Sequence, residues 1–117
     1  MSDALELSVT RLIAAPRAAV WRAFTERSAD WWCPKPWTTD IAEWDLRAGG
    51  RMALTMRGPA GEEAPQDGVF LEVRASELVV FTDAFAAGWR PQGPFMVGLM
   101  RFADEGGGTR YTGTARH

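Results

Sequence analysis

After Trp37 the sequence contains only short apolar segments separated by turn residues, and this pattern most limits what the chain can fold into. Alternating or continuously apolar segments of this length are typical of β-strands. Six are predicted, at residues 42–48, 51–57, 69–74, 78–85, 95–103 and 109–115. Because short turns join neighbouring segments, we expect an antiparallel sheet.

The first third of the chain predicts one further strand and a small amount of helix. Apolar and polar residues alternate over Leu5–Ile13, and helical spacing follows over Pro16–Glu26. Ser28 is a candidate cap for a second, brief helix that ends at the Trp31–Trp32 pair. The prolines of Cys33–Trp37 then predict a stiff, tryptophan-rich loop.

Alternation also predicts which side chains share a face of the sheet. Met52, Leu54 and Met56 are expected on one face of their strand. In the next strand, Val69, Leu71 and Val73 are expected on one face, with Glu72 on the other. We expect a mobile loop tip at residues 62–66 and a second aromatic loop at residues 86–94.

The predicted helices are too small to cover such a sheet. A helix of about eleven residues is ~16 Å long, whereas a sheet of this many strands is roughly 30 Å across. The sheet is therefore expected either to wrap around a cavity or to lack part of its cover. Since the sequence stops directly after a predicted strand, we expect a covering element to belong after His117. Without it, the exposed apolar face is expected to drive dimerisation or aggregation.

Composition excludes several classes of protein. A chain of 117 residues is expected to form a single domain, residues 1–117. One Cys and one His provide neither a disulfide nor a structural zinc site. A net charge of −2 with scattered arginines argues against a nucleic-acid partner. With no signal peptide or membrane span, we expect a cytoplasmic protein with no membrane partner.

Candidate catalytic residues are few, and they form no recognisable set. His117 is terminal, and Cys33 has no histidine near it in sequence, so no nucleophilic triad is expected. Glu43, Asp45, Glu72 and Asp83 are the carboxylates within predicted strands. Glu72 is expected to pair with an arginine on a neighbouring strand, the alternative being a polar contact to a ligand. Asp83 alternates in step with the apolar residues of its strand, which leaves an inward orientation open. We predict no catalytic residue, no metal and no cofactor.

Aromatic and methionine side chains are the most informative candidates for a site. Trp31, Trp32, Trp37 and Trp89 lie at or in the two proline-containing loops, where they either border a pocket or fill it as core. Methionine suits irregular apolar ligands but also ordinary cores. The predicted ligand-binding residues are Trp32, Trp44, Leu54, Met56, Leu71, Phe81, Phe85, Trp89, Met96 and Met100.

Several local strings, in this order, resemble one known family. They are Ile13-Ala14-Ala15-Pro16 followed by Val20-Trp21, the Trp31-Trp32 pair, Asp45-Leu46-Arg47 with Gly49-Gly50-Arg51, Gly68 to Glu72, and Val80-Phe81-Thr82. Together they resemble the bacterial homologues of the activator of heat-shock protein 90 ATPase, within the START-like, or SRPBCC, superfamily. The resemblance covers essentially the whole chain.

The resemblance implies an α+β helix-grip (START-like) fold. In this fold a curved antiparallel sheet, here of six to seven strands with short helices after strand one, wraps around a long C-terminal helix. A ligand cavity lies between the sheet and that helix. The helix would follow residues 115–117, and we expect it to be missing from this sequence.

Three functions remain open at this point. The leading hypothesis is non-enzymatic binding of a small hydrophobic or aromatic molecule. The family name suggests a second, a co-chaperone-like contact with a heat-shock chaperone. Some superfamily members resemble polyketide cyclases and dehydratases, which gives an enzyme as the third.

Overall fold

The computed structural model describes residues 6–93 and 95–117. Leu5, predicted to start the first strand, and Pro94, predicted to end the aromatic loop, lie outside these residues. The helices and strands are, in chain order, β1 (Glu6–Ile13), α1 (Arg17–Glu26), α2 (Ser28–Trp31), β2 (Thr38–Trp44), β3 (Arg51–Arg57), β4 (Glu63–Arg74), β5 (Leu78–Thr82), β6 (Phe85–Ala86), β7 (Arg90–Pro91), β8 (Val97–Glu105) and β9 (Gly108–Arg116).

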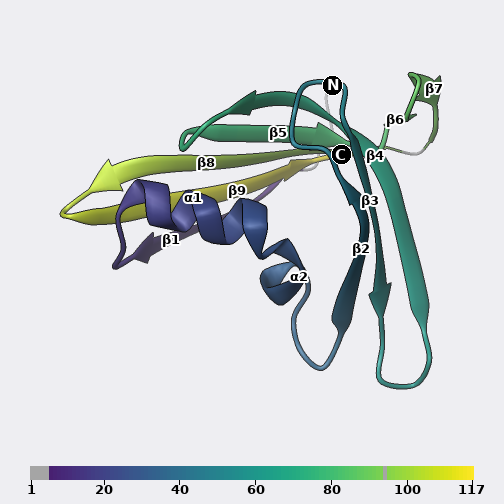
Figure 1. Ribbon diagram of the computed structural model, residues 1–117, viewed down its shortest axis with the longest axis horizontal. Helices are drawn as coiled ribbons and strands as arrows, with labels where there is room; N and C mark the ends of the chain where they lie inside the picture. Colours follow the sequence, from purple (N-terminus) through teal and green to yellow (C-terminus); the bar gives the residue numbers. More distant parts are fainter. Residues whose placement is uncertain (1–5, 94) are drawn as a thin grey trace.

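One curved, antiparallel sheet of seven strands forms the body of the molecule (Figure 1). Its strand order is β1-β9-β8-β5-β4-β3-β2, so the first and last strands of the chain are neighbours. Strands β6 and β7 form a separate two-stranded hairpin. The predicted α+β helix-grip class, with short helices after the first strand, is confirmed. Both helices precede β2, and residues 95–117 contain strands and no helix.

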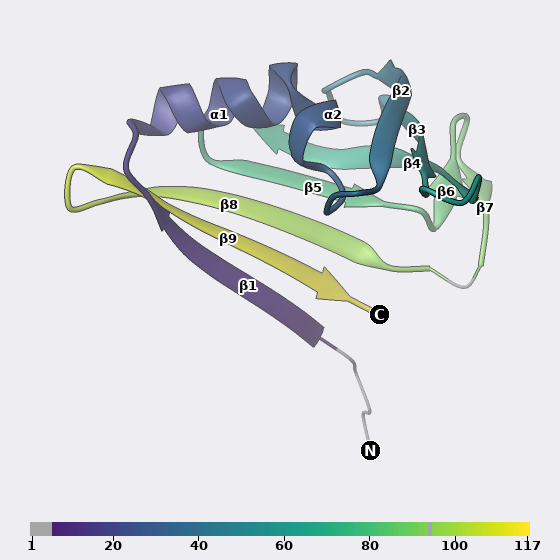
Figure 2. The ribbon, with the colours of Figure 1, turned by 90° about the horizontal axis from the view of Figure 1, so that it is seen from below.

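Helix α1 packs against one end of the concave face (Figure 2). Pro16 stands immediately before its first turn, where a missing N–H costs no helical hydrogen bond. The helix directs Val20 and Phe24 toward the sheet, and the Phe24 ring meets the Phe102 ring edge-on at 5.0 Å. Below the helix lies the buried core, which consists of Val20, Met52, Phe70, Val79, Met100 and Phe102.

The prediction that Val69, Leu71 and Val73 share one face of β4 is wrong. The pairing of β4 with β5 shifts register between Phe70 and Glu72, as in a β-bulge. The extra residue puts Phe70 in the core, and Val73 packs against the same core. Leu71 is thereby left on the surface, 37% exposed.

Two segments predicted as loops contain strand instead. Residues 63–66, expected at a mobile loop tip, begin β4 and pair with β3, and Glu63 forms an ion pair with Arg57 across the two strands. Residues 86–94, expected as an aromatic loop, include the β6–β7 hairpin, in which Phe85 is the partner of Pro91. The turn between these strands contains Trp89 with a φ of 62°.

The concave face of β1, β9 and β8 has two unlike halves. The covered half, which lies under α1, contains Ile13, Phe102 and Tyr111. The open half contains Leu7, Val9, Gly98, Gly113 and Ala115, at the other end of the same strands. No described helix is long and apolar enough to cross a membrane.

Candidate ligand-binding groove

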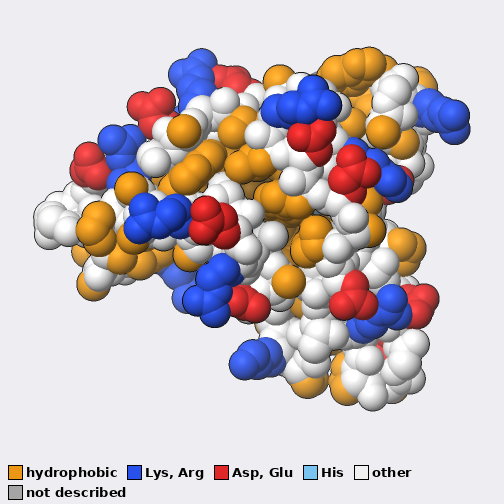
Figure 3. All heavy atoms as spheres, in the orientation of Figure 1, with side chains coloured by type: hydrophobic (Ala, Val, Ile, Leu, Met, Phe, Trp, Pro, Cys, Tyr) orange, Lys and Arg blue, Asp and Glu red, His pale blue; other side chains and the backbone are white. Residues whose placement is uncertain are grey.

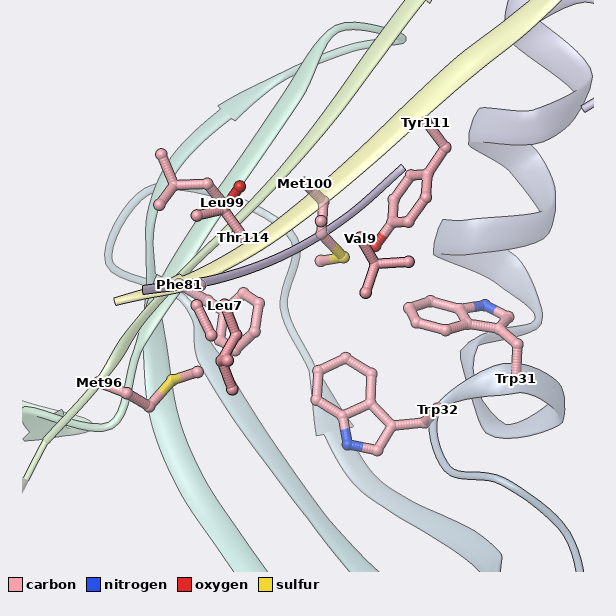
Figure 4. Close-up of a pocket in the computed structure, with 13 residues that line it drawn as sticks. Leu7, Val9, Trp31, Trp32, Phe81, Met96, Leu99, Met100, Tyr111 and Thr114 are labelled. Carbon is pink, nitrogen blue, oxygen red and sulfur yellow. The ribbon is translucent and has the colours of Figure 1, made fainter. Parts of the chain in front are cut away.

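The open half forms the bottom of an apolar groove of about 290 Å³ between β1, β9, β8 and the end of α2. Strand β1 contributes Leu7 and Val9, and the opposite wall contains Trp31 and Trp32 (Figure 4). Hydrophobic side chains gather in the middle of the face seen in Figure 3, with charged side chains around them. The volume lies at the small end of the range for pockets that bind drug-sized molecules.

Small residues form the bottom of the groove and leave its space unfilled. Gly98 and Ala115 are direct partners across β8 and β9, and Gly113 lies two residues before Ala115 on β9. A Cβ at Gly98 would overlap the Phe81 ring, which therefore lies against bare backbone. Glycine inside a strand commonly marks such a close approach.

Aromatic rings form the wall that faces β1. Trp31 and Trp32 are 5.4 Å apart between ring centroids, and Phe81 lies 5.7 Å from Trp32. Both indole N–H groups are already used. Trp31 Nε1 donates to the Ala23 carbonyl oxygen at 3.2 Å, and Trp32 Nε1 donates to Gln66 Oε1 at 3.2 Å. The wall therefore offers hydrocarbon surface to a ligand.

Among the described residues that line the groove, none is charged and one, Tyr111, carries a phenol. Tyr111 extends from β9, and its hydroxyl points into the groove near Met100 and Val9 (Figure 4). Burial raises the pKa of Tyr111 above its ordinary value of 10.0. The phenol is therefore neutral at physiological pH.

Four of the ten predicted ligand-binding residues line this groove: Trp32, Phe81, Met96 and Met100. Trp44 lies behind them, with its ring 5.7 Å from Trp32 and edge-on to Phe70 at 5.2 Å. Leu54 is buried and Met56 is half-buried on β3, and neither lines the groove.

The remaining three predicted residues lie together elsewhere. Leu71 and Phe85 line a separate shallow pocket with Phe95, and Trp89 packs edge-on against Phe85 at 5.7 Å. We call Leu71, Phe85, Trp89 and Phe95 the hairpin patch. Leu71 belongs to this patch because it follows the core residue Phe70 in β4 and points to the opposite face of the strand.

The sequence prediction missed several residues of the groove, among them Leu7, Val9 and Tyr111. Alternation places Leu7 and Val9 on one face of β1, but it does not show which strand lies beside β1. Gly98 and Gly113 carry the signal that could have been used, because glycines within predicted strands indicate a close approach or an open space.

The carboxylates considered as acids or bases are occupied by other partners. Glu72 pairs with Arg74 on its own strand, so the prediction of a cross-strand partner is wrong. Asp45 pairs with Arg47, and Glu43 with Arg51. Asp83 Oδ1 accepts a hydrogen bond from the Met96 backbone N at 2.8 Å, which links the residue after β5 to the residue before β8. None of the four carboxylates lines the groove.

The remaining reactive groups also lie outside the groove. Cys33 is half-buried, and its Sγ lies 2.9 Å from Thr39 Oγ1. His117 is exposed at the end of β9. The described residues contain no cluster of three or more His, Cys, Asp or Glu side chains that could hold a metal ion.

The family model described as activator of Hsp90 ATPase homolog 1-like protein matches residues 14–117. The chain belongs to this family. The resemblance predicted from the local strings is thereby confirmed. Among curated proteins, none matches the chain.

Solved structures agree with the family assignment. The crystal structure of a protein from Nitrosomonas europaea is 37% identical, with a TM-score of 0.89 over 97% of this chain and 75% of that chain. A protein from Mycobacterium smegmatis is 26% identical, with a TM-score of 0.80 over 97% of this chain and 72% of that one. A protein from Chromobacterium violaceum, at 24% identity and a TM-score of 0.81, shares the fold over 95% of this chain and 78% of that chain.

Proposed function

We propose that this protein binds a small neutral aromatic or other apolar molecule in the groove, without catalysing a reaction. The observation that carries the proposal is the lining itself: hydrocarbon and aromatic side chains from β1, β5, β8, β9 and α2, converging on a floor of glycine and alanine. Burying apolar surface against such a lining is favourable by about 25 cal/mol per Å².

Neutral ligands are favoured over charged ones by the same lining. A carboxylate or ammonium group placed in the groove would lose water and meet no opposite charge among the lining residues. The acidic side chains of the strands are engaged by arginines or by backbone outside the groove. These observations support binding rather than acid–base chemistry.

Two substitutions on β1 test the proposal. Val9 and Leu12 are almost equally exposed, at 56% and 57%, yet Val9 lines the groove and Leu12 does not. Val9→Trp is expected to fill the groove, whereas Leu12→Trp adds the same side chain outside it. Calorimetric titration with a panel of neutral bicyclic compounds, including naphthalene, tetralin and α-tetralone, measures the outcome.

The wild-type protein and Leu12→Trp are expected to bind a member of the panel with similar affinity. Val9→Trp is expected to bind it at least about tenfold more weakly. Equal affinities for the two tryptophan variants, or no binding of any panel member to the wild type, would overturn the proposed function.

A further inference from the structure

We propose that the Tyr111 hydroxyl is a hydrogen-bond donor that selects neutral ligands carrying a carbonyl or similar acceptor. This inference rests on the proposed function and specifies the ligand class of the same groove. Within residues 6–93 and 95–117 the Tyr111 hydroxyl makes no hydrogen bond, and Figure 4 shows it directed into the groove. It is the one phenol in the chain.

Packing holds the phenol ring of Tyr111 in place. The ring lies 4.7 Å from the Phe24 ring of α1 and 5.6 Å from the Phe102 ring of β8. The tyrosine therefore belongs to the covered half through its ring and reaches the open half with its hydroxyl. A donor held in this way loses little conformational freedom when a ligand binds.

Gly113 leaves the space that the hydroxyl occupies. A Cβ at this position would lie 2.5 Å from Tyr111 Oη, closer than real side chains approach. Val9, the cross-strand partner of Gly113 on β1, lies beside the same space. The strand sequence Tyr111-Thr112-Gly113 thus places a hydroxyl against bare backbone at the bottom of the groove.

The other polar side chain of the lining is turned away. Thr114 Oγ1 lies 3.3 Å from Ser8 Oγ, in a contact between β9 and β1, and its side chain points away from Trp31 and Trp32 (Figure 4). With both indole N–H groups donated to protein oxygens, Tyr111 Oη is the side-chain donor left for a ligand among the described residues that line the groove. A ligand carbonyl has lone pairs to accept that hydrogen and carries no charge to desolvate.

Tyr111→Phe with two ligands of matched shape tests the inference. The substitution removes the hydroxyl and retains the ring that packs on Phe24 and Phe102. α-Tetralone has a ketone where tetralin has a methylene group, so only the ketone can accept a hydrogen bond. Calorimetry of the full chain measures four dissociation constants, those of wild type and variant with each ligand.

For α-tetralone, we expect the variant to bind about 3- to 10-fold more weakly than the wild type, as the loss of one hydrogen bond predicts. For tetralin, we expect the two proteins to agree within about twofold. If both ligands bind and the substitution weakens neither, or weakens both equally, the inference is wrong while the proposed function stands. If neither ligand binds the wild type, this inference fails, and the proposed function fails with it only when no other member of the panel binds.

Discussion

The two halves of the β1-β9-β8 face share the same strands and the same alternation, but they differ in side-chain size and in cover. In the covered half, Phe102 pairs with Tyr111 across β8 and β9, and α1 packs on both. In the open half, the corresponding pair is Gly98 and Ala115. Phe102 on β8 is 3% exposed, whereas Leu7 on β1, on the far side of β9, is 68% exposed.

The contrast indicates that one half of the face stabilises the sheet, while the other half provides the space for a ligand. Large side chains under a helix bury apolar surface and hold the strands together. Small side chains in the uncovered half bury little, but they leave a space whose walls are aromatic. Tyr111 is the residue at which the two halves meet. The predictions below are ordered from the largest expected effect to the smallest.

Truncation of a covered residue should be much more costly than truncation of an open one. Phe102→Ala removes a buried ring that contacts Trp21, Phe24 and Tyr111, and it should lower the free energy of unfolding by about 3–5 kcal/mol. Val9→Ala should lower it by less than about 1 kcal/mol, since Val9 is half-exposed. Urea denaturation of both variants measures the difference. Similar losses for the two would contradict the division into halves.

A methyl group added to the groove floor should disturb the packing above it. In Gly98→Ala the new Cβ overlaps the Phe81 ring, so the ring must move into the groove at a cost of about 1–3 kcal/mol in stability. Gly93→Ala is the control, because no heavy atom lies within 4 Å of a Cβ at that position. Thermal unfolding should show Gly98→Ala clearly below wild type and Gly93→Ala close to it. If the two alanine variants melt together, the Phe81 ring does not rest on Gly98.

The pKa of Tyr111 should report how far its hydroxyl is buried at the boundary between the two halves. Because the chain has a single tyrosine, its tyrosinate absorbance measures this residue alone. We expect a midpoint above 10.0 in the folded protein and a return to the ordinary value in urea. The unfolded chain then loses its proton first, so the contribution to the free energy of unfolding is complete below pH 10 and is lost as the pH rises toward the folded-state pKa.

Tyr111→Phe should lack this contribution to the pH dependence of stability, which makes it the control. A midpoint at or below 10.0 in the folded protein would show that water surrounds the hydroxyl and would contradict its burial.

Much of the fold could be predicted because its signals are local. Alternation in residues 51–57 and the glycine turns identify strands, and the order of short strings identifies the family. The wrong predictions have local structural causes that the pattern of apolar and polar residues does not show. One bulge in β4 put Leu71 and Val73, which were expected on one face, on different faces of the sheet. The ion pair between Arg57 and Glu63 accompanies strand pairing where a loop tip was expected.

The groove could be predicted only in part, because it depends on contacts between distant segments. Trp32, Phe81, Met96 and Met100 were identified as large apolar residues, but so were Leu71, Phe85 and Trp89, which form the hairpin patch. What separates the two sets is the pairing of β1 with β9, which joins the two ends of the chain. No short-range pattern reports that pairing.

The account's central claim is that a small apolar ligand binds in the open half. Methyl NMR of the methionines tests it most directly, because Met96 and Met100 line the groove while Met56 lies outside it on β3. On addition of α-tetralone to the wild-type protein, we predict shifts of the Met96 and Met100 methyl signals and none at Met56. A shift at Met56 without one at Met100, or no shift at any of the three, would contradict the claim.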